Sequence, residues 1–321
     1  MKKIFIAMMA MAAMTACATE DTIVTPQGAA IAFGDAFVDN STKAIYESAA
    51  DVQGFQVWGN VKGTNATPAA LYGDTGAAVT RDGAALGVAW TCSVVRYWTP
   101  SCTYNFVAIA NGTAAELANG VPTKISYTVG ATEPADLIYG ATAAKTDDQS
   151  APIEGVNGNK VVAFTMKHLL SRVKLSFNNQ LDAEKATDYR YTISNVKVVT
   201  AGSGTYTIDG SSWDCGANAN IPCTGLSPIP NGTTESYGAQ LVIPSALVQL
   251  VFDYALELKT GTDTWTAINS ATDHTLNVTT TFEEGKSYNI TVALKAGAQI
   301  DFSVSESTNL GWGDDNTATV Q

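Results

Sequence analysis

The sequence predicts an all-β protein built from two antiparallel β-sandwiches that meet near residue 160. Many short apolar segments alternate with polar residues at a period of two, and turn residues separate them at near-regular spacing. No stretch shows the period of a long amphipathic helix. The chain has 321 residues, 45% of them hydrophobic, which is enough for two domains of ordinary size.

The charge balance argues against two classes of partner. The chain has 30 acidic and 18 basic residues, for a formal net charge of −12. Nucleic acids and anionic membrane surfaces are bound by clustered Lys and Arg, so we expect neither as a partner. An acidic composition poor in lysine is typical of a secreted or surface β-protein.

Residues 1–16 have the pattern of an export signal. Lys2 and Lys3 precede an apolar run over residues 4–13, which is too short to span a bilayer permanently. Residues 14–17, Met-Thr-Ala-Cys, are similar to a bacterial lipobox, which predicts cleavage between Ala16 and Cys17 and lipidation of Cys17. The alternative is ordinary cleavage nearby, with Cys17 as a spare thiol. Residues 17–29 indicate a polar tether.

The N-terminal sandwich is predicted over residues 30–159. Its first strand covers residues 30–38, a short segment containing Ala and Gly that we expect to gain little from its own side chains. Further strands are predicted at residues 55–61, 90–92, 94–98, 104–109, 126–129 and 136–139. A polar loop follows at residues 144–159.

Residues 161–178 are the stretch around which the chain is organised. Phe164, Met166 and His168 keep one parity, whereas Val173 and Leu175 keep the other. A slip of one residue near positions 171–172 reverses the buried face, so we expect a long strand that leaves one sheet and enters another. A helix is the competing interpretation, but β-branched residues and flanking turn residues favour a strand.

The C-terminal sandwich is predicted over residues 160–321. Alternation marks strands at residues 189–199, 205–208, 240–243, 247–259 and 287–295. Ile300, Phe302 and Val304 continue the alternation into the tail, and residues 309–315 break it.

Four cysteines remain when Cys17 is set aside, and they form two local pairs. An even number in an exported chain indicates disulfides. Close spacing favours, among three possible connectivities, the links Cys92 to Cys102 and Cys215 to Cys223. A metal site is the alternative, but no CxxC spacing occurs, and His168 and His274 lie far from both pairs in sequence.

No motif predicts catalysis or a cofactor. A nucleophile elbow and a phosphate-binding loop are both missing from the sequence, and His168 is expected to be a core histidine rather than a catalytic one. The acidic pairs at residues 147–148, 283–284 and 314–315 indicate solvated turns, with a weak calcium site as the alternative. The aromatic residues Trp58, Trp90, Tyr97, Trp98 and Tyr104 are expected in cores rather than on a sugar-binding platform. A non-enzymatic protein is therefore expected.

A series of short motifs carries a family resemblance. In order they are IAF at 31–33, TKA at 42–44, FQVWG at 55–59, RYWTP at 96–100, NFVAIA at 105–110, DLIYGAT at 136–142, FTMKHLLSRVKLSF at 164–177 and GWGDD at 311–315. Together they cover nearly the whole mature chain. The sequence thereby resembles the fimbrillin-like (Mfa-like) family of fimbrial subunit and anchor lipoproteins of Bacteroidales.

The resemblance implies two transthyretin-like sandwich domains in a lipoprotein that is exported to the cell surface and builds or anchors fimbriae. Glu20 and Asp21, close after Cys17, resemble a signal for display on the outer face of the outer membrane. Lys43 stands where many relatives have arginine. Proteolytic processing at Lys43 is therefore expected to be inefficient, to use a different trypsin-like enzyme, or not to occur.

Family members of this kind are expected to assemble by strand exchange. Loss of the first strand would expose an apolar groove, which an extended segment of the next subunit would fill by β-augmentation. The expected donor is the tail after Lys295, with its apolar residues Ile300, Phe302, Val304, Leu310 and Trp312. Expected partners are other fimbrial subunits, the outer membrane through the lipid, and host or bacterial surface ligands. The alternative function is a monomeric glycan-binding surface lipoprotein.

Overall fold

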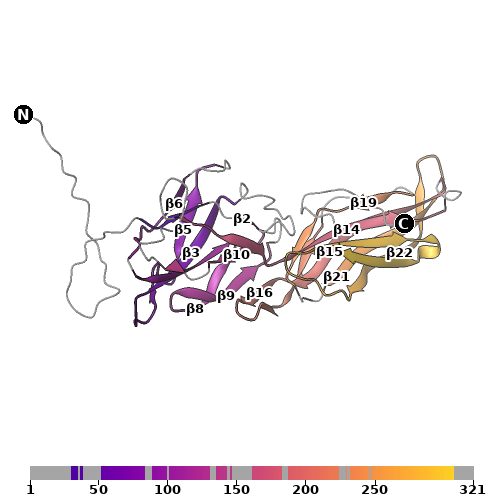
Figure 1. Cartoon of the computed structure of the whole chain (residues 1–321). Helices are drawn as coiled ribbons and strands as arrows, with labels where there is room; N and C mark the ends of the chain where they lie inside the picture. The colour runs from indigo at the N-terminus through magenta and orange to yellow at the C-terminus, as the bar shows by residue number, and fades with distance from the viewer. Residues whose placement is uncertain are drawn as a thin grey trace, which may run out of the picture.

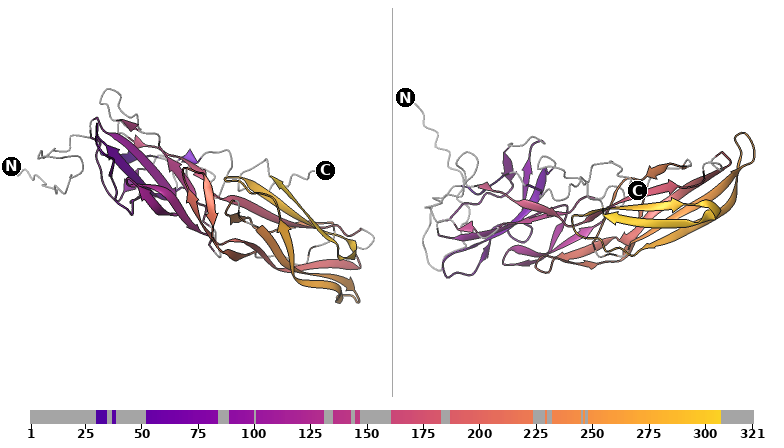
Figure 2. Two further views of the ribbon diagram at one scale, coloured as in Figure 1. Left: turned by 90° about the horizontal axis from the view of Figure 1, so that it is seen from below. Right: turned by 45° about the vertical axis from the view of Figure 1, so that its right-hand side comes forward.

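The computed structural model describes residues 30–34, 37–38, 52–83, 89–99, 101–130, 135–142, 145–146, 161–182, 187–223, 229, 232–244, 246 and 248–306. Within these ranges the elements are strands, with a single 3₁₀ turn at η3 (Ala296–Ala298). Figure 1 shows an elongated molecule, with the strands of the first half at one end and those of the second half at the other, and both views of Figure 2 show the same arrangement. The prediction of an all-β fold is confirmed.

One large sheet dominates the first half. Its strands run in the order β2 (Phe37–Val38), β13 (Thr165–His168), β10 (Ile138–Ala141), β7 (Thr103–Ala110), β3 (Gly54–Lys62), β5 (Ala77–Arg81) and β6 (Trp90–Cys92), with β4 (Ala69–Ala70) and β11 (Lys145–Thr146) beside β3 and β7. Both faces of its centre are buried. On β3, Val57 packs into one core and Trp58 into another, because successive side chains of a strand point to opposite faces.

The change of parity after His168 is a change of sheet. β13 pairs with β10 in the large sheet, whereas β14 (Ser171–Asn179) pairs with β23 (Ser287–Leu294) in another. Leu169 and Leu170, between the two strands, are both fully buried. The predicted passage from one sheet to the next is confirmed, and the two consecutive buried leucines place it just before the predicted slip.

Two sheets enclose the core of the second half. One has the order β19 (Thr234–Ser236), β14, β23 and β24 (Ile300–Glu306), with β20 (Gln240–Val242) also beside β14. The other has the order β18 (Asn218–Pro222), β15 (Tyr189–Ala201), β21 (Val248–Lys259) and β22 (Trp265–Val278). Phe177 of the first sheet meets Phe252 of the second edge to face, with ring centroids 5.0 Å apart.

Most neighbouring strands are antiparallel, as predicted, but three pairs of described strands run parallel. These are β14 with β23, β1 (Ala32–Phe33) with β12 (Val161–Val162), and β2 with β13. A parallel pair needs a long crossover connection. Between β14 and β23 that connection includes all four strands of the opposing sheet, which local alternation in the sequence does not reveal.

A fifth sheet joins the two halves. Its order is β17 (Ser212–Cys215), β16 (Ser203–Thr207), β9 (Val121–Thr128) and β8 (Thr113–Ala118), so a hairpin from each half meets at the β9–β16 pair. A separate apolar cluster lies there and includes Trp58, Ile125, Leu170 and Tyr206. The expected boundary at residues 159–160 is therefore spanned by a sheet and a core that both halves share.

Candidate functional site

The first strand lies in a slot of the N-terminal half. On one side β1 runs parallel to β12, with Ala32 opposite Val161, and the N–H of Gly34 donates to the carbonyl of Val162 at 3.0 Å. On the other side the N–H of Ile31 donates to the carbonyl of Arg96 at 2.7 Å, and Ala30 forms an antiparallel bridge with Tyr97. Because both edges of β1 are paired, its departure would leave backbone groups open on two sides.

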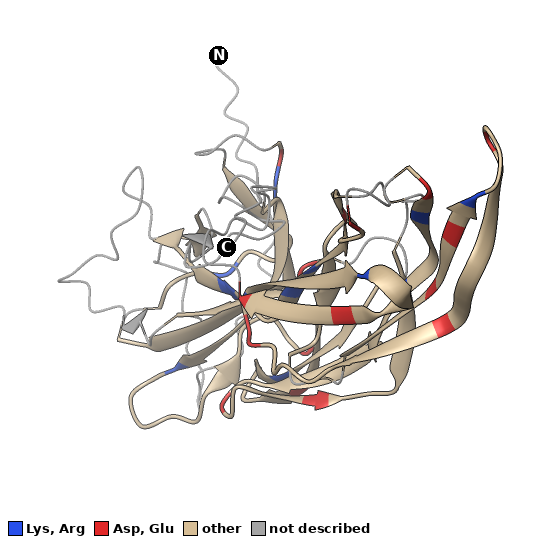
Figure 3. Cartoon of the chain, turned by 90° about the vertical axis from the view of Figure 1, so that its right-hand side faces the viewer, with Lys and Arg blue, Asp and Glu red and all other residues tan. Residues whose placement is uncertain are grey.

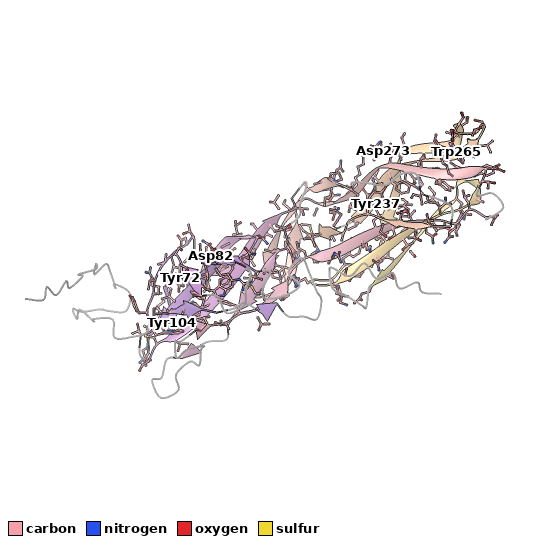
Figure 4. All side chains as sticks on the ribbon, turned by 90° about the horizontal axis from the view of Figure 1, so that it is seen from above. Tyr72, Asp82, Tyr104, Tyr237, Trp265 and Asp273 are labelled. Atoms are coloured by element: carbon pink, nitrogen blue, oxygen red, sulfur yellow. The ribbon has the colours of Figure 1, made fainter. Side chains whose placement is uncertain are left out.

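Phe33 fills an aromatic pocket beneath this slot. Its side chain is 4% exposed. The ring contacts Phe55, Tyr72, Phe106 and Phe164, at centroid distances of 6.3, 6.4, 6.0 and 6.2 Å. Figure 4 shows Tyr72 in this half of the molecule, together with Tyr104 of the same core. The expectation that the first strand gains little from its own side chains is therefore wrong, because its short sequence places one large ring at the centre of a core.

The C-terminal strand β24 docks on its own half at the edge of a sheet. It pairs antiparallel with β23 from Ile300 to Glu306. Two exposed ion pairs hold its ends, Lys295 with Asp301 at 2.5 Å and Lys286 with Glu306 at 3.3 Å. Ile300 and Val304 pack against the core, whereas Phe302 is 37% exposed. Three of the expected donor residues, Ile300, Phe302 and Val304, thus lie on one strand, and Phe302 is the most exposed of them.

Several predicted site residues lie outside the described residues. They are Ala16, Cys17, Lys43, Leu310 and Trp312. Cleavage, lipidation and processing at these positions therefore stay predictions.

The described cysteines carry no disulfide in this structure. Cys92 and Cys102 lie at the same core, and their link stays a prediction, which disulfide-linked peptides in a non-reducing digest would test. Cys215 and Cys223 are placed differently: Cys215 lies opposite Gly204, and Cys223 follows a strand whose Pro222 lies opposite Lys197.

This strand register contradicts the expected disulfide between Cys215 and Cys223. The two residues lie at opposite ends of one extended segment, about 25 Å apart at the rise of a strand. A disulfide needs Cα atoms within about 7 Å. The link therefore does not fit this register, because the segment runs along β15 and β16 instead of folding back on itself.

A buried histidine and carboxylate meet where the chain changes sheets. Nδ1 of His168 lies 2.7 Å from Oδ2 of Asp136, and the two side chains are 1% and 0% exposed. Burial raises the pKa of the Asp136 carboxyl, because the charged form loses its hydration there. The sequence predicts His168 as a core residue, and the structure shows the carboxylate that makes its burial tolerable.

A polar cluster crosses the junction close by. Nζ of Lys167 lies 3.1 Å from the hydroxyl of Tyr206 and 3.5 Å from Oε2 of Glu284. The Tyr206 hydroxyl also donates to Glu284 at 3.2 Å, and burial raises the pKa of the Glu284 carboxyl. Sequence analysis missed this cluster, because the partners lie 39 and 117 residues from Lys167 and no local pattern connects them.

The part of the chain that the structure describes was compared with the requirements of a metal site and of a membrane span. Within the described ranges, no group of three or more His, Cys, Asp and Glu residues is placed to hold a metal ion. In the same ranges, none of the helices has the length and apolar character to cross a bilayer. Lys and Arg are scattered among the strands rather than gathered on one element (Figure 3).

Comparison with protein families is decisive. The model of the fimbrillin-like family matches residues 42–308, which is most of the chain. The chain belongs to the fimbrillin-like family. The match includes β3 to β24, begins after β1 and β2, and ends just beyond Glu306.

Solved structures resemble this fimbrillin-like protein at low sequence identity. A fimbrial protein from Bacteroides vulgatus is 14% identical with a TM-score of 0.62, over 86% of this chain and 98% of that one. A putative cell adhesion protein from Bacteroides uniformis has 15% identity and a TM-score of 0.46, over 88% and 98%. The fimbrial anchor protein Mfa2 from Porphyromonas gingivalis has 9% identity and a TM-score of 0.38, over 88% and 97%. A comparison with curated proteins finds no match.

Proposed function

We propose that this fimbrillin-like protein is a non-enzymatic fimbrial subunit or adhesin of the cell surface, joined to other subunits by strand exchange. Family membership supports the fimbrial role, and the B. vulgatus structure of the same fold is a fimbrial protein. The observation that carries the exchange is the slot of β1, whose removal with the residues before a cut at Lys43 would open an aromatic pocket and two strand edges.

The energy of exchange comes from burial and backbone pairing together. Each large apolar side chain that enters a neighbour's slot contributes about 1.5–3 kcal/mol. An incoming strand also restores the hydrogen bonds that Ile31 and Gly34 now make with Arg96 and Val162. The donor in this proposal is the tail from Ile300 onward, which must first leave the edge of β23.

Cutting the chain after Lys43 is expected to convert a monomer into a ladder of denaturation-resistant oligomers on a gel. The same cut chain carrying Phe302→Asp should stay monomeric yet folded, because that side chain is 37% exposed on its own half, whereas in the slot of a neighbour it would be buried. Polymerisation of the uncut chain to the same extent would show that the first strand is not the gate. A full ladder from Phe302→Asp would place the donor elsewhere.

We further propose that the chain is held at the outer membrane through a lipid on Cys17. Replacing Cys17 with alanine should move the protein from the membrane fraction to the soluble fraction of cells, because in this proposal the lipid on Cys17 is what holds the chain at the membrane. Retention of Cys17→Ala in the membrane fraction, after a salt wash that removes peripheral proteins, would contradict the lipid anchor.

The glycan-binding alternative gains no support from the aromatic residues that suggested it. Trp58, Trp98 and Tyr104 are buried at 3% exposure or less, so their faces are not open to a sugar. Tyr97 is exposed, but it lies at the edge of the first strand, where it forms a bridge with Ala30.

A further inference from the structure

We infer that the segment 161–179 carries mechanical tension through the subunit, and that its parallel pairing with β23 is the clamp that resists this tension. The inference rests on the proposed function, because tension along a fimbria passes through every subunit. The observation behind it is that all three parallel pairs among the described strands share this one segment. These pairs are β1 with β12, β2 with β13, and β23 with β14.

The segment crosses the junction as a continuous covalent chain. Its first strand, β12, lines the slot of β1, and its last strand, β14, lies in the other half (Figure 1). Between them, the N–H of Leu169 donates to the carbonyl of Leu137 at 3.0 Å. The carbonyl of Leu170 accepts from the N–H of Gly285 at 2.8 Å. Tension that enters at the slot therefore reaches β14 through covalent bonds, and not only through contacts between the halves.

Such a tension loads the pairing of β14 with β23 in shear. The two strands are parallel from Arg172 opposite Ser287 to Asn179 opposite Leu294, and the hydrogen bonds of a parallel pair are evenly spaced. The junction holds β14 at its start, whereas the load leaves β23 at its end, where the chain continues to β24. Strands that are pulled from opposite ends load all of their hydrogen bonds at once. Strands that are pulled from the same end separate one hydrogen bond at a time.

Buried side chains protect the clamp from water. On the core face, residues at most 3% exposed lie opposite one another, namely Val173 with Tyr288, Leu175 with Ile290 and Phe177 with Val292. Hydrogen bonds in such surroundings are stronger than in water. β14 is also paired on its other edge, with β19 and β20, so β23 is the strand that must slide if the clamp is to open.

The C-terminal strand is attached in the opposite geometry. β24 is antiparallel to β23, so its last residue, Glu306, lies beside the start of β23, opposite Tyr288. A pull beyond β24, directed away from the junction, therefore peels this strand from its last residue backwards. Phe302 is 37% exposed, and the ion pairs of Asp301 and Glu306 are exposed, so they add little resistance. The clamp bears the load once β24 has peeled away.

Single-molecule pulling on the purified full chain tests the clamp with one shared attachment point. An azide-bearing residue replaces Ala296, just after β23, and a second one replaces either Ala163, before β14, or Gln180, just after β14. All three positions are exposed. The 163–296 pair pulls the two strands from opposite ends, whereas the matched 180–296 pair pulls them from the same end. At one pulling speed, the force that separates β14 from β23 should be several-fold higher for 163–296.

Moving the shared attachment point to Ser305, an exposed residue of β24, tests the peeling step. Pulling between 163 and 305 should give a weak first event, in which β24 is released, and then a peak as high as that of the 163–296 pair. A single high peak without the weak event would contradict the peeling of β24. Circular dichroism and the urea midpoint of each labelled chain, compared with those of the parent, verify that the attachment points leave the fold intact. Asp182, which is also exposed, replaces Gln180 if that variant is unstable.

The outcomes separate the clamp from the proposed function. Equal forces for the 163–296 and 180–296 pairs overturn the clamp, because stability alone does not depend on the direction of pulling. If the forces are equal and the chain cut after Lys43 still forms a ladder, the proposed function stands without the clamp. If the forces differ as expected but no ladder forms, the result supports the clamp and overturns the proposed strand exchange.

Discussion

Phe33→Ala is expected to lower the free energy of unfolding of the uncut chain by about 3–5 kcal/mol. The ring is 4% exposed and contacts four other aromatic rings, so its removal leaves a cavity that these rings cannot easily fill. The loss should appear as a lower midpoint in urea or guanidinium with an unchanged slope.

Phe302→Ala is the matched control for this experiment. It deletes the same side chain from another short strand, but at a site that is 37% exposed, so its cost should be well below half of that for Phe33→Ala. Equal losses for the two variants would mean that the first strand is not docked as described. A shallower slope for Phe33→Ala would indicate instead that the first strand detaches separately from the rest.

His168→Ala is expected to cost about 3–5 kcal/mol, because it leaves the Asp136 carboxylate buried without its imidazole partner. The control is His274→Ala. That ring packs beside Phe252 and Tyr254, at centroid distances of 5.3 and 5.5 Å, and its loss removes packing without stranding a charge, so the cost should be smaller. Similar costs for the two substitutions would contradict the role given to the His168–Asp136 pair.

The pH dependence of His168→Ala provides a second test. Burial raises the pKa of the Asp136 carboxyl in the fold above its value of about 3.9 in the unfolded chain. The folded state then binds more protons than the unfolded state over the interval between the two pKa values, so stability falls as the pH rises through it. In the unsubstituted protein, the hydrogen bond from the His168 imidazole opposes this rise in the pKa of the Asp136 carboxyl. The deficit of His168→Ala should therefore be smallest near pH 4 and should grow toward neutral pH, whereas a deficit independent of pH would count against it.

The sequence predicts those features that depend on which face of a strand is buried. Met166 and Leu175 reveal the change of sheet, and Ile31 with Phe33 reveal a buried face, because alternation is a local property. Strand partners are not local. The pairing of β9 with β16 and the parallel pairing of β14 with β23 join segments far apart in the sequence, so no pattern within a window of residues indicates them.

The Cys215–Cys223 pair and the packing of Phe33 also depend on contacts that are not local in the sequence. Short spacing brings Cys215 close to Cys223 only if the segment between them turns back, whereas here it runs extended along β15 and β16. The sequence of the first strand, with its small residues, does not indicate how many aromatic rings surround Phe33. The unequal exposure of Phe33 and Phe302 likewise depends on tertiary contacts, because the residues next to them in the sequence are similar.

The sheet shared by both halves bears on how the molecule comes apart. Residues 203–207 pair with residues 121–128 in one sheet, and Trp58, Ile125 and Tyr206 belong to one apolar cluster that spans the junction. Neither half can lose its structure without exposing this common core. The molecule should therefore melt as one cooperative unit, and a gene divided at residue 160 would yield two fragments that each expose an unpaired strand and half of an apolar interior.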